Sequence, residues 1–121
     1  MSTYDLTDTE LAHFHGTEQW YRHSVVKSVL YTEGAQYVAE HGGAYWLLDE
    51  IALAQAFNRG IAREPFQVWT LVVEPTQQAR LVIDDGNGRI VGRKRIPFTD
   101  FPLPSITLWC VDKVIMLPSE Y

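Results

Sequence analysis

The pattern of hydrophobic and polar positions gives its clearest signal in the middle of the chain. Residues 44–58 are strong helix formers with no Gly or Pro among them, so we predict a helix there. With about 3.6 residues per turn, its apolar side chains fall on two separate faces. These faces are formed by Trp46, Leu53 and Phe57 on one side and by Leu47, Leu48 and Ile51 on the other. We expect a sheet to cover one face, and the N-terminal segment or a second subunit to cover the other.

The second half of the chain alternates short, apolar, β-prone runs with turn residues. These runs predict strands at 66–73, 80–83, 89–96, 105–111 and 114–117. The second and third runs flank the sequence Asp-Asp-Gly-Asn-Gly at 84–88, which is typical of a hairpin turn. The expected fold is therefore α+β: an antiparallel sheet of four to six strands, with the helix at 44–58 packed on one face and a short N-terminal helix.

The N-terminal part of the chain carries shorter signals. Residues 1–6 have no periodicity and are expected to form a loose end. Residues 7–10 have the spacing of a capping box, which predicts a short helix that ends near Gly16. A second helical turn is predicted over residues 17–21.

Residues 28–40 fit two different structures. Glu33 and Gly34 separate two apolar β-prone runs, which favours a two-residue hairpin. In the alternative, Thr32 caps a helix whose buried positions are Ala35, Val38 and Ala39. The period of such short runs does not settle the choice, and we favour the hairpin.

Length and composition point to one soluble globular domain over residues 1–121. Hydrophobic residues make up 46% and charged residues 21%, which argues against disorder. The net charge of −5 works against general binding of nucleic acid. Cys110 is the only cysteine, so no internal disulfide forms, and the chain lacks a secretory signal and an apolar run long enough to span a membrane. We expect a cytoplasmic protein.

The sequence carries none of the familiar metal, nucleotide or hydrolase motifs. An EF-hand counted from Asp84 or Asp85 would need a Glu at its twelfth position, where the chain has Arg95 or Ile96. No P-loop, dinucleotide fingerprint or Gly-x-Ser-x-Gly elbow is present. Cys110 lies in an apolar run, as an inert core thiol does. We therefore expect no metal and no cofactor.

Three residues remain as candidates for catalysis: His23, Tyr45 and Asp49. Asp49 either lies on a narrow solvent-facing stripe of the helix at 44–58 or is a partly buried carboxylate hydrogen-bonded to a Tyr or His. The second arrangement would create a pocket beside the helix and is the alternative hypothesis of a small enzyme or ligand-binding protein.

A basic run forms the candidate binding site. Arg89, Arg93 and Arg95 would share one face of the predicted strand, with Lys94 on the other. A solvated or edge-protecting strand is the first explanation, and a site for phosphate or an acidic partner is the second. Binding candidates are therefore Trp46, Arg93, Lys94 and Arg95, and contact of the last three with nucleic acid is a weaker alternative function.

Four stretches of the chain resemble a known family. They are residues 30–34 (Leu-Tyr-Thr-Glu-Gly), 44–49 (Ala-Tyr-Trp-Leu-Leu-Asp), 99–103 (Thr-Asp-Phe-Pro-Leu) and 117–121 (Leu-Pro-Ser-Glu-Tyr). The family consists of small uncharacterised bacterial proteins with a domain of unknown function, often carried on plasmids and other mobile elements. The resemblance runs from about Leu11 to the last residue. It implies a bacterial, intracellular, single-domain protein and brings no activity, cofactor or site residue.

The function that the sequence favours is a protein–protein interaction module. The missing catalytic motifs, the 12% of aromatic residues and the acidic net charge support it. Self-association into a homodimer is one form that such a module would take.

Overall fold

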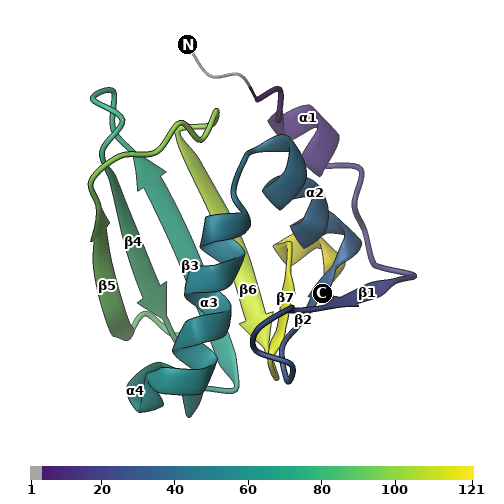
Figure 1. Cartoon of the computed structure of the whole chain (residues 1–121), viewed down its shortest axis with the longest axis vertical. Coiled ribbons are helices and arrows are strands. Elements are labelled where there is room, and N and C mark those ends of the chain that lie inside the picture. The colour runs from purple at the N-terminus through teal and green to yellow at the C-terminus, as the bar shows by residue number, and fades with distance from the viewer. Residues whose placement is uncertain (1–3) are drawn as a thin grey trace.

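The computed structural model describes residues 4–121, whose strands form a single mixed sheet in the order β1-β2-β7-β6-β3-β4-β5 (Figure 1). All neighbouring strands are antiparallel except β2 and β7, which are parallel. The strand bounds are Trp20–Arg22 (β1), Leu30–Thr32 (β2), Phe66–Val73 (β3), Ala79–Asp84 (β4), Ile90–Ile96 (β5), Ser105–Val111 (β6) and Val114–Met116 (β7).

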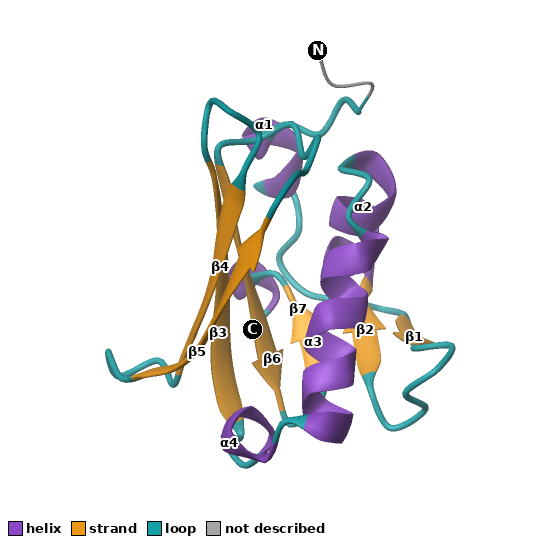
Figure 2. Cartoon of the chain, turned by 60° about the vertical axis from the view of Figure 1, so that its left-hand side comes forward, coloured by secondary structure: helices purple, strands orange, loops and turns teal. Residues whose placement is uncertain are grey.

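The longer helices lie on one side of this sheet. Figure 2 shows α2 and α3 on the same side of β3, β4, β5 and β6. The helix bounds are Asp8–Leu11 (α1), Glu33–His41 (α2), Tyr45–Phe57 (α3), Arg59–Ala62 (α4) and Pro118–Glu120 (the 3-10 helix η1). No helix of the described residues is long and apolar enough to cross a bilayer.

The helix predicted at 44–58 is α3, and only one of its two apolar faces is fully buried. Leu47, Leu48 and Ile51 are at most 1% exposed against the sheet. On the other face, Leu53 is 40% and Phe57 82% exposed. Within the described residues the N-terminal segment does not cover this face, and its coverage by a second subunit stays a prediction.

The sheet agrees with the sequence in its second half and differs in its first. The five predicted strands are present as β3 to β7, with their ends shifted by no more than one residue. The expected four to six antiparallel strands fit only in part, because β1 and β2 raise the number to seven among the described residues and β2 pairs in parallel with β7. The helical turn predicted at 17–21 is wrong: Trp20 and Tyr21 belong to β1, where they pair with β2.

The hairpin favoured at residues 28–40 is also wrong, and the alternative helix is confirmed. The chain passes from β2 into α2, and the hydroxyl of Thr32 accepts a hydrogen bond from the amide of Ala35 at 3.2 Å. The three positions expected to face the core in this alternative are completely buried: Ala35, Val38 and Ala39. An N-cap side chain and an apolar helical face thus outweigh the turn preference of Glu-Gly.

The N-terminal segment packs on the core at Leu6, whereas the sequence predicted a loose end there. The predicted cap of α1 is confirmed, since Thr7 accepts from the amide of Glu10, but the helix ends at Leu11, well before Gly16. Residues 1–3 of the expected loose end lie outside the described residues. Leu6 is only 3% exposed and belongs to the core.

Candidate functional site

The structure brings two of the three catalytic candidates into contact. Nε2 of His23, in the segment after β1, lies 2.7 Å from Oδ1 of Asp49 on α3. His23 is only 5% exposed, whereas the Asp49 side chain is 58% exposed. Both descriptions offered for Asp49 are therefore partly met: it faces solvent, and it is hydrogen-bonded to a histidine.

The second ring nitrogen of His23 shows what this contact does. Nδ1 accepts hydrogen bonds from the amides of Val25 and Val26, at 3.2 and 3.0 Å. An acceptor at Nδ1 requires the neutral tautomer in which Nε2 carries the hydrogen and donates it to Asp49. With both ring nitrogens engaged, His23 has no free lone pair with which to take a proton from a substrate. The geometry makes it a clamp that holds the β1–β2 loop against α3.

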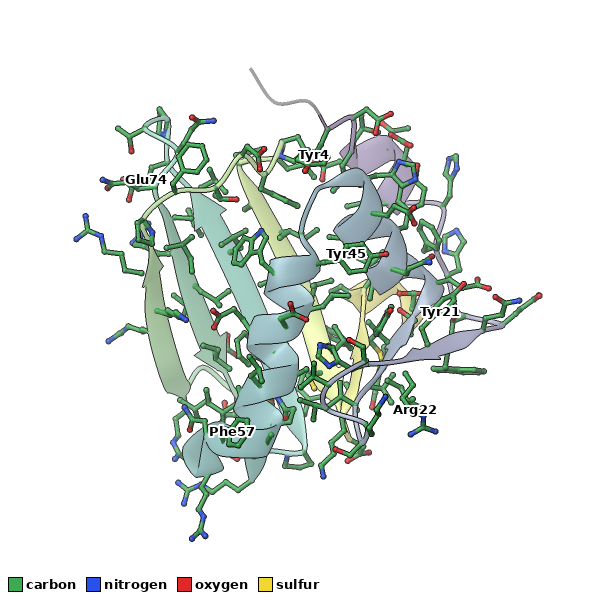
Figure 3. The ribbon with its side chains drawn as sticks, in the orientation of Figure 1. Tyr4, Tyr21, Arg22, Tyr45, Phe57 and Glu74 are labelled. Carbon is green, nitrogen blue, oxygen red and sulfur yellow. The ribbon has the colours of Figure 1, made fainter. Side chains whose placement is uncertain are left out.

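Three tyrosines lie around this contact. Tyr21 and Tyr31 are stacked with their ring centres 5.5 Å apart, and Tyr45, at the start of α3, is 45% exposed. Figure 3 shows Tyr45 on α3 and Tyr21 on β1. Burial, followed by the charges of Tyr21 and Asp49, raises the pKa of Tyr31. Burial, followed by the charge of Glu40, raises the pKa of Tyr45. The raised pKa values keep the phenols of Tyr31 and Tyr45 neutral, as donors and not as bases.

The basic residues lie at the open edge of the sheet. β5 is the last strand in the sheet order, so one of its edges has no pairing strand among the described residues. The register confirms the predicted facing of three basic residues: Arg93 and Arg95 lie opposite Val82 and Arg80, and Lys94 lies opposite Leu81 on the helix side. Arg89, which was expected on the face of Arg93 and Arg95, precedes β5 and does not belong to the strand. The guanidinium group of Arg93 forms no hydrogen bond or ion pair with any described residue.

Between β5 and α3 the helix side of the sheet is hollowed into a groove of about 600 Å³. We call it the α3–β5 groove. Leu53 and Phe57 form its helix wall, and Figure 3 shows Phe57 near the end of α3 that adjoins α4. Its other lining residues include Ile61, Trp69, Leu81, Ile83 and Gly92. Lys94 crosses the groove and pairs with Glu50 at 2.6 Å.

Trp46, the remaining binding candidate, lies beyond this ion pair. It is half-buried and lines a smaller hollow of about 390 Å³ together with Lys94 and the exposed Phe98. Trp46, Lys94 and Arg95 thus line one hollow, and Trp46 lies one helical turn from Asp49 on α3.

Neither α2 nor α3 covers the opposite side of the sheet (Figure 2). We call this the helix-free face. Its positions alternate with core residues along β3, β4, β6 and β7, and many of them are nonetheless apolar and half-buried: Phe66, Val68, Val72, Val82, Trp109, Val111 and Met116. Tyr121 packs edge-on against both Phe66 and Trp109, at ring distances of 5.9 and 5.5 Å. The signal for this face was present in the sequence, since β3 and β6 are apolar at both odd and even positions.

The sequence did not predict a buried network of polar side chains. The side-chain amides of Gln55 on α3 and Gln67 on β3 form two reciprocal hydrogen bonds of 2.8 and 2.9 Å. Oε1 of Gln67 also accepts from Nε1 of Trp69 at 3.0 Å, and its Nε2 donates to two backbone carbonyls near α4. No known sequence motif predicts a pair of glutamines of this kind. The pair ties α3 and α4 to β3, and it holds Trp69, which lines the α3–β5 groove.

Comparison with known proteins yields one finding. The profile of DUF6876, a family of unknown function, matches residues 5–121. The chain belongs to this family. No curated protein and no solved structure shows significant similarity to it. Among the described residues, no group of three or more His, Cys, Asp or Glu side chains is arranged to hold a metal ion.

Proposed function

We propose that this protein is a small protein–protein interaction module that binds through its helix-free face, with a second copy of the chain as its partner. The observation that supports this proposal is the apolar character of that face. A sheet face that meets water normally alternates polar residues with core residues, yet Val68, Trp109 and Val111 occupy such positions here. Apolar residues collected on one uncovered face mark an interaction surface.

The shape of this face suits another sheet. Thr70 and Thr107 pair at its centre, and Val68 and Trp109 pair beside them, so small and large side chains are interleaved across β3 and β6. Two sheets pack about 10 Å apart when their inner faces interdigitate in this way. A two-fold axis through the pair of threonines would place equal surfaces of two copies against each other.

The proposal is tested by sedimentation equilibrium of the wild type and two variants. Thr107→Arg places a charge at the centre of the helix-free face without removing apolar area from the core. Val25→Arg is the matched control, because Val25 is 70% exposed in the β1–β2 loop. We expect the wild type and Val25→Arg to be dimers and Thr107→Arg to be a monomer with the same circular dichroism. A monomeric wild type, or a dimer that survives Thr107→Arg, would refute the proposal.

We also propose that the protein acts in the reducing cytoplasm of a bacterium, as one domain, and that its gene travels on plasmids or other mobile elements. The resemblance of the four stretches supports the bacterial origin and the mobile carriage. The single cysteine, Cys110, supports a reducing compartment.

A further inference from the structure

We propose that the open edge of β5 and the α3–β5 groove beside it bind an extended segment of another protein in which apolar and acidic side chains alternate. This inference goes beyond the proposed function and does not depend on it. It concerns the free edge of β5, with the α3–β5 groove on the helix side and Arg93 and Arg95 on the other side, and a different partner.

The backbone of β5 supplies the first part of the argument. β5 pairs with β4 along Ile90–Ile96 and has no strand on its other side among the described residues. In an antiparallel pair, alternate residues turn their N–H and C=O groups away from the partner strand. These groups on β5 are free to pair with one more strand, which is how an extended peptide adds to a sheet.

The charges on β5 decide which strand can be added. Arg93, Lys94 and Arg95 follow one another on this edge, while the whole chain has a net charge of −5. A second copy that offered its own β5 would bring like charges together, so the basic run opposes edge-to-edge self-association. An acidic segment would instead bring opposite charges together. The side chain of Arg93 is available for such a contact, because it lacks an ion-pair partner among the described residues.

The residues on the two faces of β5 predict which side chains the added strand should carry on each face. Arg93 and Arg95 point to the side of the sheet without helices, so the residues beside them on the added strand should be acidic. Gly92 and Lys94 belong to the helix side. A Cβ on Gly92 would lie 3.0 Å from Cδ1 of Ile61, so glycine lets α4 pack closely beneath the groove. Residues of the added strand on this side face Phe57 and should be apolar.

Nucleic acid fits this surface less well. Its phosphates would meet the carboxylates of Glu50 and Glu64, which already pair with Lys94 and Arg89 at 2.6 and 3.8 Å. The groove itself is lined mainly by aliphatic and aromatic side chains and offers few donors to a phosphate. An acidic protein segment uses both the charges and the apolar groove.

The test begins with a peptide display library of about eight residues, the length of an ordinary strand. Apolar residues are fixed at alternate positions, and the others are randomised among acidic, neutral and basic residues. The library is selected on the wild-type chain and, in parallel, on the Thr107→Arg variant. The comparison shows whether peptide binding depends on the dimer of the helix-free face. We expect acidic residues to be enriched at the randomised positions in both selections.

The enriched peptide is then measured by fluorescence anisotropy against matched variants. Arg93→Glu combined with Arg95→Glu should weaken binding roughly tenfold or more, because two opposite-charge contacts become repulsive. Phe57→Ser should weaken it as well. The controls are Arg22→Glu, which changes an exposed arginine at the far edge of the sheet, and Val25→Ser, and neither should alter the affinity.

Backbone methylation of the peptide separates strand addition from other modes of binding. Two peptides with opposite methylation phases are compared, one N-methylated at the odd residues and one at the even residues. Methylation of the residues whose N–H groups face β5 should abolish binding, and methylation of the other set should leave binding intact. The inference is overturned by selection of peptides without acidic enrichment, by equal effects of both methylation phases, or by tighter binding of a single-stranded DNA oligonucleotide through the same arginines.

Discussion

Glu120 should be a main support of the fold although it is the second-last residue of the chain. Its Oε1 accepts hydrogen bonds from the hydroxyl of Thr32 at 2.6 Å and from the amide of Leu117 at 2.9 Å. Its Oε2 accepts from the amide of Gly34 at 3.0 Å. The carboxylate therefore lies at the N-terminus of α2, where a negative charge is stabilised by the free amides and the helix dipole.

The cost of Glu120→Ala follows from these contacts. A hydrogen bond to a charged group contributes about 1.5–3 kcal/mol, and an N-cap contributes about 1 kcal/mol. Thr32 is only 2% exposed, so water cannot easily replace the lost partner of its hydroxyl. The bond from Leu117 lies within the same short turn and adds less. We expect Glu120→Ala to lower the free energy of unfolding by about 2–4 kcal/mol, out of about 5–15 kcal/mol for a domain.

Urea unfolding followed by circular dichroism measures this loss. Ser119→Ala is the matched control, since Ser119 is exposed and adjacent, and it should change stability little. Glu120→Gln keeps the shape and loses the charge, so it should fall between the control and Glu120→Ala. A loss below about 1 kcal/mol for Glu120→Ala would refute the reasoning, because it would equal that of an ordinary surface contact.

A double-mutant cycle with Gly34 tests the same contact from the other side. A Cβ on Gly34 would collide with the Glu120 carboxylate and would lie 2.8 Å from Cδ1 of Leu117. Gly34→Ala should therefore destabilise the wild type. It should cost less in the Glu120→Ala background, where the main obstacle is gone. Additive effects of the two substitutions would contradict direct contact between them.

Three further predictions concern the core and the N-terminal helix. Burial raises the pKa of Cys110 to about 12, so a thiol reagent at neutral pH should label it only at the rate of unfolding, and labelling of the native protein at the rate of a free thiol would contradict this. Gln67→Leu should cost about 2–4 kcal/mol in urea unfolding, because the indole N–H of Trp69 loses its buried partner; a loss no larger than that of an exposed substitution would count against the network. Hydrogen bonds from Tyr37 and then Thr7 lower the pKa of Glu10 from its ordinary 4.5, so their stabilisation is present above pH 4.5 and is lost as the pH falls through the lowered value. The stability difference between wild type and Tyr37→Phe should accordingly shrink in acid, and a pH-independent difference would exclude the linkage.

The parts of the fold that the sequence predicted are those fixed by local interactions. α3 and the strands β3 to β6 each carry their own period, turn residues and length. β1 and β2 are three residues long and exist because Trp20 pairs with Thr32 and because β2 meets β7 from the far end of the chain. The choice between hairpin and helix after Thr32 depends in part on Glu120, a residue 88 positions away. Periodicity within a short window contains none of this information.

The candidate site was predictable in its residues and not in its geometry. His23 and Asp49 are chemically suited to acid–base work, and the structure places them in contact. Their roles follow from the two amides that bond to Nδ1 of His23, which no spacing rule announces. For the basic run the geometry was predictable, because the alternation of side chains along a strand predicts that Lys94 faces away from Arg93 and Arg95.

The buried polar groups of the described residues are satisfied within the fold. The buried polar side chains of the described residues, among them His23, Gln55 and Gln67, all have hydrogen-bond partners within the chain. The unused bonding capacity of this molecule lies elsewhere, in the free edge of β5 and in two uncovered apolar surfaces. Strand addition and surface packing are the interactions that such features support, and both are ways of binding another protein.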